Sequence, residues 1–96
     1  MRLSYHCAVQ RETDDACIWY DERKEGLGDE FFRELESMLG KIAQNPRAFP
    51  PTSCGRRRAR LIRFPYVICY RELSDRVRIL AVQHERRHPA YATGRE

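Results

Sequence analysis

Larger hydrophobic residues alternate with polar or small residues at the start of the chain, over residues 2–9. The hydrophobic positions there are Leu3, Tyr5, Cys7 and Val9. A period of two is typical of a half-buried strand, in which successive side chains point to opposite faces of a sheet. Residues 2–9 are therefore predicted to form the first strand.

The next segment changes to helical periodicity. Thr13 is followed by Asp14 and Asp15, a pattern typical of a helix N-cap with acids in the first turn, and Gly26 is a natural stop. In a helix of this extent one face carries Ala16, Trp19, Tyr20 and Arg23. We therefore expect Trp19 and Tyr20 to be core residues.

A second, longer helix is predicted up to Asn45-Pro46, which ends it. Its apolar residues recur at helical spacing, so that Phe31, Leu35 and Leu39 are expected in the core. The full stripe is Leu27, Phe31, Leu35, Met38, Leu39 and Ile42.

The second half of the chain has the composition of strands. Residues 48–55 include two adjacent prolines and are predicted to form a loop. Residues 57–64, 66–73 and 76–84 are rich in β-branched, aromatic and aliphatic side chains and are predicted to form three consecutive antiparallel strands. The last is apolar on both faces from position 77 to 82, which indicates a central strand covered by the helices on one side.

The order β-α-α-β-β-β predicts an α+β fold with a helical hairpin packed on a twisted, mainly antiparallel sheet. A length of 96 residues favours one domain over residues 1–96. No apolar run reaches the roughly 18 residues of a membrane span, and no apolar signal segment follows the first residues. We expect a soluble, cytoplasmic protein without membrane contact.

Charge is distributed unevenly along the chain. Residues 1–54 hold seven basic and ten acidic residues, a net charge of −3, whereas residues 55–96 hold eleven and four, a net charge of +7. Every basic residue of the second half is arginine, which binds phosphate and carboxylate groups with a planar fork. The pattern indicates anionic partners; the alternatives are a solvated arginine-rich face or pairing with the acidic first half.

The cysteines show no pattern of a metal site. They are Cys7, Cys17, Cys54 and Cys69, with no C-x-x-C pair and no histidine at ligand spacing. Without a secretory signal we interpret them as reduced, small apolar residues. We expect neither a metal nor another cofactor.

Several short motifs follow one another along nearly the whole chain. They are Trp19-Tyr20, Leu27-Gly28 before Phe31, Asn45-Pro46, Arg63-Phe64-Pro65-Tyr66, Tyr70, and residues 82–91 with His84, Arg86, Arg87, Pro89 and Tyr91. Together they resemble the RelE/ParE toxin superfamily of type II toxin-antitoxin systems, also described as plasmid stabilization proteins. The family fold agrees with the element order predicted above.

The resemblance implies a bacterial toxin that arrests growth and is neutralised by a cognate antitoxin in a hetero-oligomer. The superfamily has two branches: RelE-like toxins cut messenger RNA on the ribosome, and ParE-like toxins inhibit DNA gyrase. The nuclease branch typically carries an arginine shortly before the tyrosine matched by Tyr70 and a basic pair after the last strand. This chain has Val67-Ile68-Cys69 and Glu85 there, and a carboxylate has the wrong sign to stabilise a phosphorane. The H-x-R-R-x-P pattern at 84–89 resembles the ParE branch, so a binding toxin is favoured over an enzyme.

Two sets of candidate site residues follow. As a binding protein, the chain would contact gyrase or the antitoxin through Arg57, Arg58, Arg60, Arg63, Arg86 and Arg87. As an endoribonuclease acting on the ribosome and its mRNA, it would use His84, Arg60, Arg63 and Tyr91. The alternative for His84 and for Pro89-Ala90-Tyr91 is structural, closing the end of the sheet. A third hypothesis is a basic interaction module that has lost toxicity.

Overall fold

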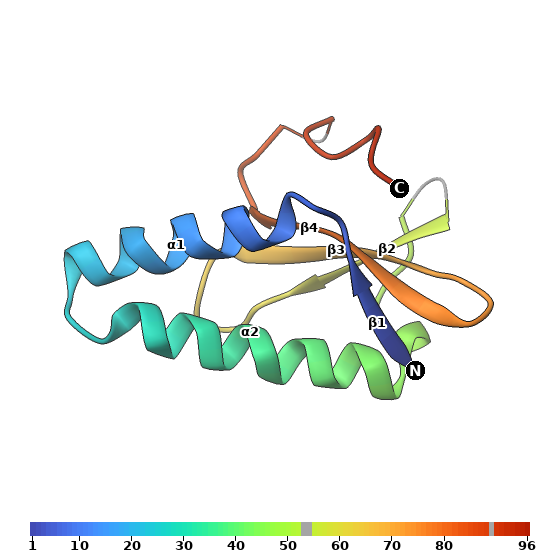
Figure 1. Ribbon diagram of the computed structural model, residues 1–96, viewed down its shortest axis with the longest axis horizontal. Coiled ribbons are helices and arrows are strands. Elements are labelled where there is room, and N and C mark those ends of the chain that lie inside the picture. Colours follow the sequence, from blue (N-terminus) through green and yellow to red (C-terminus); the bar gives the residue numbers. More distant parts are fainter. Residues whose placement is uncertain (53–54, 89) are drawn as a thin grey trace.

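The computed structural model describes residues 1–52, 55–88 and 90–96 of the chain. Figure 1 shows the sheet between two other parts of the chain, with α2 of the helical hairpin on one side and the C-terminal tail on the other. The order is β1 (Arg2–Tyr5), α1 (Val9–Arg23), α2 (Leu27–Gln44), η1 (Pro46–Ala48), β2 (Arg56–Arg60), β3 (Tyr66–Glu72) and β4 (Arg76–His84). The predicted α+β fold is confirmed.

The sheet has the strand order β1-β4-β3-β2. The pairs β2–β3 and β3–β4 are antiparallel, whereas β1 is parallel to β4. As predicted, β4 is central. It also contains a β-bulge, because Cys69 pairs with Ala81 and Tyr70 with Ile79, which leaves Leu80 as the extra residue.

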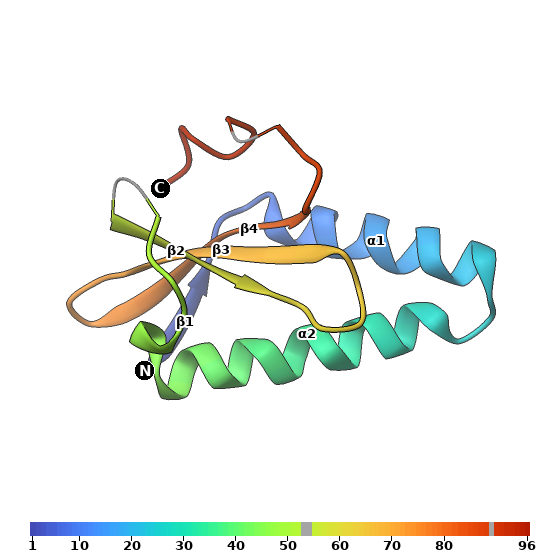
Figure 2. The ribbon, with the colours of Figure 1, turned by 180° about the vertical axis from the view of Figure 1, so that it is seen from behind.

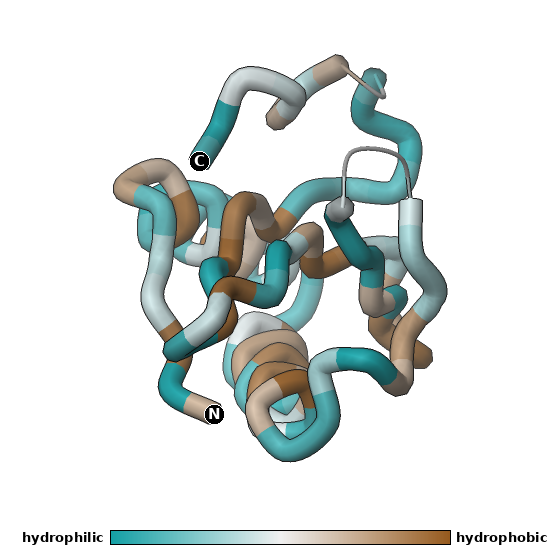
Figure 3. The backbone as a smooth tube through the Cα atoms, turned by 90° about the vertical axis from the view of Figure 1, so that its right-hand side faces the viewer, coloured by the Kyte–Doolittle hydropathy of each residue, from teal (hydrophilic) through white to brown (hydrophobic). Residues whose placement is uncertain are grey.

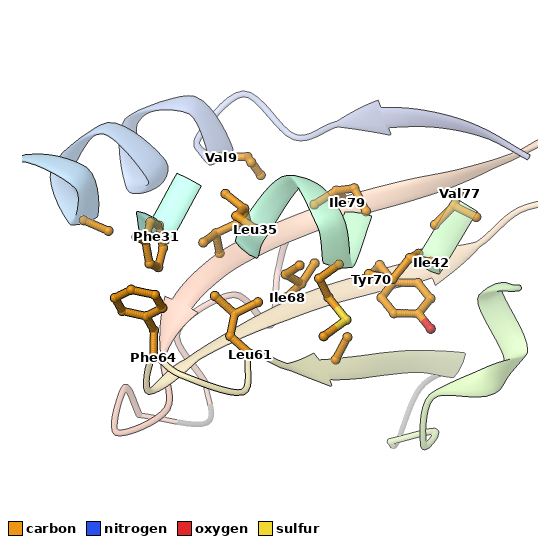
Figure 4. Close-up of a cluster of buried hydrophobic side chains, with 14 of the residues drawn as sticks. Val9, Phe31, Leu35, Ile42, Leu61, Phe64, Ile68, Tyr70, Val77 and Ile79 are labelled. Carbon is orange, nitrogen blue, oxygen red and sulfur yellow. The ribbon is translucent and has the colours of Figure 1, made fainter. Parts of the chain in front are cut away.

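The core lies between α2 and the sheet (Figure 4). The α2 face that the periodicity identified is buried as predicted for Phe31, Leu35, Met38 and Ile42, whereas Leu39 is only partly buried at its margin. Opposite them lie strand residues such as Ile68, Tyr70, Val77 and Ile79, all fully buried. In Figure 3 hydrophobic residues gather where α2 meets the sheet, and the tail is mostly hydrophilic.

The first strand and first helix have different bounds from those predicted. Strand pairing ends early, with a last bond from the amide of His6 to the carbonyl of Ile79 (2.8 Å), and the His6 ring then accepts the amide of Ala8 (3.1 Å) in a turn. The helix begins at Val9, so Thr13 is no N-cap. Its buried hydroxyl instead donates to the carbonyl of Val9 one turn back (2.9 Å).

The second strand is shorter than residues 57–64. It ends at Arg60 because Leu61 and Phe64 turn into the core, where both are buried. The turn is closed by the amide of Leu61, which donates to the carbonyl of Tyr66 (2.9 Å). The carboxylate of Glu34 accepts the amide of Arg63 and so attaches this turn to α2.

Trp19 is not a core residue, contrary to the prediction. Its side chain is 48% exposed, whereas the adjacent Tyr20 is buried among Phe31, Phe64 and Tyr66. The guanidinium of Arg23 lies 3.4 Å from the centre of the indole ring and covers one of its faces. The Trp19 ring therefore packs against the Arg23 guanidinium, whereas the helical spacing predicted that it would pack in the core.

The cysteines in the described part of the chain, Cys7, Cys17 and Cys69, are free thiols, in line with their interpretation as reduced residues. Cys54 lies outside the described residues, as does Pro89. No helix in the described ranges is long and apolar enough to cross a membrane.

Candidate functional site

The central strand β4 has an open edge beyond the end of β1. Because β1 pairs only as far as Ile79, the amide of Val82 faces α1, where it donates to a carboxylate oxygen of Glu12 (3.0 Å). The other oxygen of Glu12 accepts the hydroxyl of Tyr91 and the guanidinium of Arg95, each at 2.7 Å. One side chain thus joins α1, the sheet and the C-terminal tail.

A cavity of about 550 Å³ opens beside this junction, between α1, the start of β3 and the end of β4. His84 and Tyr91, two residues of the predicted nuclease set, both line it, as does Arg87. The remaining lining residues include Asp15, Trp19 and Tyr66. The structure therefore brings together the residues of the 84–91 motif with acids and aromatic rings of α1.

The polar atoms of His84 and Tyr91 already have structural partners. The Nδ1 atom of His84 accepts the amide of Arg86 (3.1 Å), and its ring lies edge-on to Tyr66 with 5.4 Å between centres. The Tyr91 hydroxyl donates to Glu12, and its ring is flanked by the guanidinium groups of Arg87 and Arg95. These contacts agree with the structural alternative, in which both residues close the end of the sheet.

The two arginines of the nuclease set are ion-paired elsewhere. Arg60 binds Glu85 at 2.7 Å, and Arg63 binds Glu30 of α2 at 2.6 Å. The hydrogen bond from Arg60 holds the pKa of Glu85 below its ordinary value, and that from Arg63 does the same for Glu30. His84, Arg60, Arg63 and Tyr91 are thus not gathered in one arrangement for phosphorane stabilisation.

The six arginines predicted to bind a partner fall into two groups. Arg57 donates to the carbonyl of Phe49 (2.7 Å), and Arg60 and Arg63 form the ion pairs above. Arg58, Arg86 and Arg87 form no ion pair with any described residue, and the last two are exposed after β4. Of the six arginines, Arg58, Arg86 and Arg87 are thus the ones without an ion pair or hydrogen bond through the guanidinium to a described residue.

Sequence reasoning missed three residues that organise this region: Glu12, Arg56 and Arg95. Arg56 donates to three carbonyls of the tail, those of Ala92 (2.7 Å), Thr93 (2.8 Å) and Arg95 (2.6 Å). Arg95 also donates to the carbonyl of the bulged Leu80 (3.1 Å). An available signal was the placement of Glu12 among helix formers at 10–12, which indicated an earlier helix start.

No group of three or more histidine, cysteine or acidic side chains suited to a metal ion occurs within residues 1–52, 55–88 and 90–96. The acids and histidines around the cavity are engaged with arginines, tyrosine and backbone amides, as described above.

Comparison with known proteins places the chain in a family. A family model described as "ParE toxin of type II toxin-antitoxin system, parDE" matches residues 5–89, and the chain therefore belongs to the ParE toxin family. Among curated proteins, no sequence matches it significantly.

A solved structure described as the chromosomal ParDE TA system from P. aeruginosa has the same fold. It superposes with a TM-score of 0.78 over 88% of this chain and 95% of that chain. Sequence identity is 17%, so the likeness concerns the fold.

Proposed function

We propose that this protein is a ParE-like toxin that inhibits DNA gyrase by binding it in the bacterial cytoplasm, and that a cognate antitoxin neutralises it. The observation that carries the proposal is the match to the ParE toxin family over residues 5–89. Growth arrest would follow from loss of DNA supercoiling.

The side-chain contacts support binding over RNA cleavage. A nuclease needs cations free to stabilise a phosphorane, and removal of a single such donor costs enzymes about a hundredfold or more. Here Arg60 is paired with Glu85 and Arg63 with Glu30. Exposed Arg86 and Arg87 instead suit contacts with an acidic protein surface.

A groove at the helical hairpin supports an antitoxin partner. It measures about 390 Å³ and lies between the end of β1, α1 and α2, with Tyr5, Val9, Phe32 and Leu39 in its lining. Phe32 is 41% exposed beside it. We propose that the C-terminal segment of the antitoxin, acidic and amphipathic, folds onto this groove and the arginine-bearing sheet, which neutralises charge and buries apolar surface together.

The target is tested by a paired assay with purified toxin. One arm follows gyrase supercoiling of a relaxed plasmid, with relaxation by a type I topoisomerase as control, and the other follows mRNA cleavage on programmed ribosomes. We expect loss of supercoiling with intact mRNA. Codon-positioned cuts with normal gyrase activity would establish the ribosome-dependent nuclease instead, and neither activity from a folded protein would point to a module without toxicity.

The antitoxin is tested with the neighbouring reading frame, which should encode a short protein with an acidic, amphipathic end. We expect the two products to co-purify, and Phe32→Asp to weaken the complex at least tenfold. Ile62→Asp is the matched control, because Ile62 is 77% exposed and lies outside the groove. The proposal is contradicted if the protein is monodisperse and non-toxic alone and does not bind the protein encoded by the neighbouring reading frame.

A further inference from the structure

A second cavity lies between the sheet and the C-terminal tail, on the face of the sheet opposite α2. Its volume is about 440 Å³, within the range of small-molecule sites. The small side chains of Cys69 and Ala81, which pair across β3 and β4, form one apolar cluster with Ala92 of the tail. Figure 2 shows the tail passing over this face of the sheet as a separate segment.

A row of arginines crosses the sheet beside this cavity. Arg56 of β2 pairs with Arg71 of β3, and Arg71 pairs with Arg78 of β4. Arg58, the next residue of β2 on the same face, pairs with Cys69. Like charges placed directly opposite each other in a sheet destabilise it, so this row requires compensation.

For Arg56 and Arg78, the hydrogen-bond partners are backbone oxygens. Arg56 donates to three tail carbonyls, and Arg78 donates to the carbonyls of Tyr5 (2.9 Å) and Glu96 (3.4 Å). Half-buried Arg58 forms neither a hydrogen bond nor an ion pair through its side chain with the described residues. Glu96 is the one acid among the described residues that line the cavity. Among the described residues that line the cavity, arginines therefore outnumber acids.

A buried polar group adds to the site. Gln83 lines the cavity, is only 6% exposed, and pairs with Val67 one row beyond Cys69 on the same face. Its side-chain amide has no hydrogen-bond partner in the described part of the chain. The side-chain amide of Gln83 is therefore available to donate an N–H to a ligand in the cavity.

We propose that this cavity binds a phosphate group, free or carried by a small nucleotide, with Arg58 as its principal ligand and Gln83 as a neutral donor. Phosphate suits the site because it accepts several hydrogen bonds at once and carries up to two negative charges, which opposes the excess along the arginine row. The cavity lies apart from the hairpin groove but on the arginine-bearing sheet, which the antitoxin segment is also proposed to contact, so phosphate binding is tested on the toxin alone. Its occupation does not depend on the proposed gyrase target.

The test is a calorimetric titration of the full chain with inorganic phosphate and with adenosine 5′-monophosphate at constant ionic strength. We expect saturable one-site binding of at least one probe, weakened about tenfold by Arg58→Ala and less by Arg58→Lys, which keeps the charge and loses the fork. If adenosine 5′-monophosphate binds more tightly than inorganic phosphate, the ligand of the cavity is a nucleotide. If inorganic phosphate binds equally or more tightly, the ligand is the free phosphate ion.

Arg33→Ala is the matched control, because Arg33 is an exposed arginine of α2 remote from the tail. It should leave both affinities unchanged. Equal weakening by Arg33→Ala, or no saturation by either probe, would overturn the site and indicate only general attraction to a basic protein. A circular dichroism spectrum of Arg58→Lys that matches the unmodified protein shows that weaker binding does not result from unfolding.

Discussion

At the scale of single residues, Glu12 connects three parts of the chain. Its side chain is 10% exposed and binds the amide of Val82, the hydroxyl of Tyr91 and the guanidinium of Arg95. A buried charge pair is weak evidence of net stabilisation, but the loss of one partner leaves the other charge buried without compensation. The contribution of Glu12 is therefore best measured by its removal.

We expect Glu12→Ala to lower the free energy of unfolding by about 3 kcal/mol, since it leaves Arg95 unpaired and the Val82 amide without an acceptor. Glu22→Ala is the control: Glu22 pairs with Arg23 at 3.8 Å on the surface, and its loss should change stability by less than about 0.5 kcal/mol. Urea denaturation of both variants measures this. Similar values for the two would show that the Glu12 junction contributes little.

The pKa of Glu85 offers a second test at this scale. Because the hydrogen bond from Arg60 lowers it, the pair stabilises the fold above the unfolded-state pKa, and this stabilisation is lost as the pH falls through the folded-state pKa. We expect Arg60→Gln to raise the pKa of Glu85 toward its ordinary value in an NMR titration. Arg63→Gln should instead raise the pKa of Glu30 and leave Glu85 unchanged. A shift of both carboxyls in both variants would contradict separate pairs.

At the scale of elements, the two helices approach each other closely at Gly28. Its amide donates to the carboxylate of Asp21 (2.7 Å), and a Cβ placed there would lie 2.5 Å from the carbonyl oxygen of Cys17. The backbone of α2 here lies against the Cys17 carbonyl and the Asp21 carboxylate of α1, with no room for a side chain on residue 28. Gly40, in the same helix, has open space around its Cα.

Substitution of these two glycines by alanine is expected to change the stability of the protein in opposite directions. We expect Gly28→Ala to destabilise the protein by about 1–3 kcal/mol, because the Cys17 carbonyl must move away. Gly40→Ala should stabilise it by about 0.5–1 kcal/mol, since alanine is the better helix former and meets no neighbour. Thermal unfolding of both variants provides the measurement, and a stabilised Gly28→Ala protein would show that the helices tolerate a wider separation.

At the scale of the whole molecule, some of the basic residues of the second half of the chain form ion pairs with acidic residues of the first half. Arg63 and Arg95, from the basic half, bind Glu30 and Glu12, from the acidic half. The predicted alternative of internal pairing is thus realised at these positions. Arg86 and Arg87 are exposed and form no ion pair with any described residue.

The proposed gyrase target can be tested by comparing the toxicity of variants at Arg86 and Arg87 with that of a variant at His84. We expect the combined change Arg86→Ala and Arg87→Ala to reduce gyrase inhibition and toxicity more than His84→Ala does, because a binding protein depends on its contact residues and not on a proton-transfer group. Inhibition curves and growth assays measure the difference, with circular dichroism and antitoxin binding as controls for folding. Near-complete loss of toxicity from the histidine change alone would favour an enzyme.

The amino-acid sequence by itself determined the order of elements, the extent of α2 and of β4, and the buried stripe of α2, because these follow from hydrophobic periodicity along the chain. It did not determine where α1 begins or where β2 ends. Those bounds depend on contacts between residues far apart in the sequence, namely His6 with Ile79 and Arg63 with Glu34. The roles of the arginines were decided only by the tertiary structure: all look alike in sequence, but Arg56 meets tail carbonyls, Arg60 meets a carboxylate, and Arg58 meets neither. Periodicity reports which side of an element is buried, whereas the partner of a charged group is set by what the fold brings beside it.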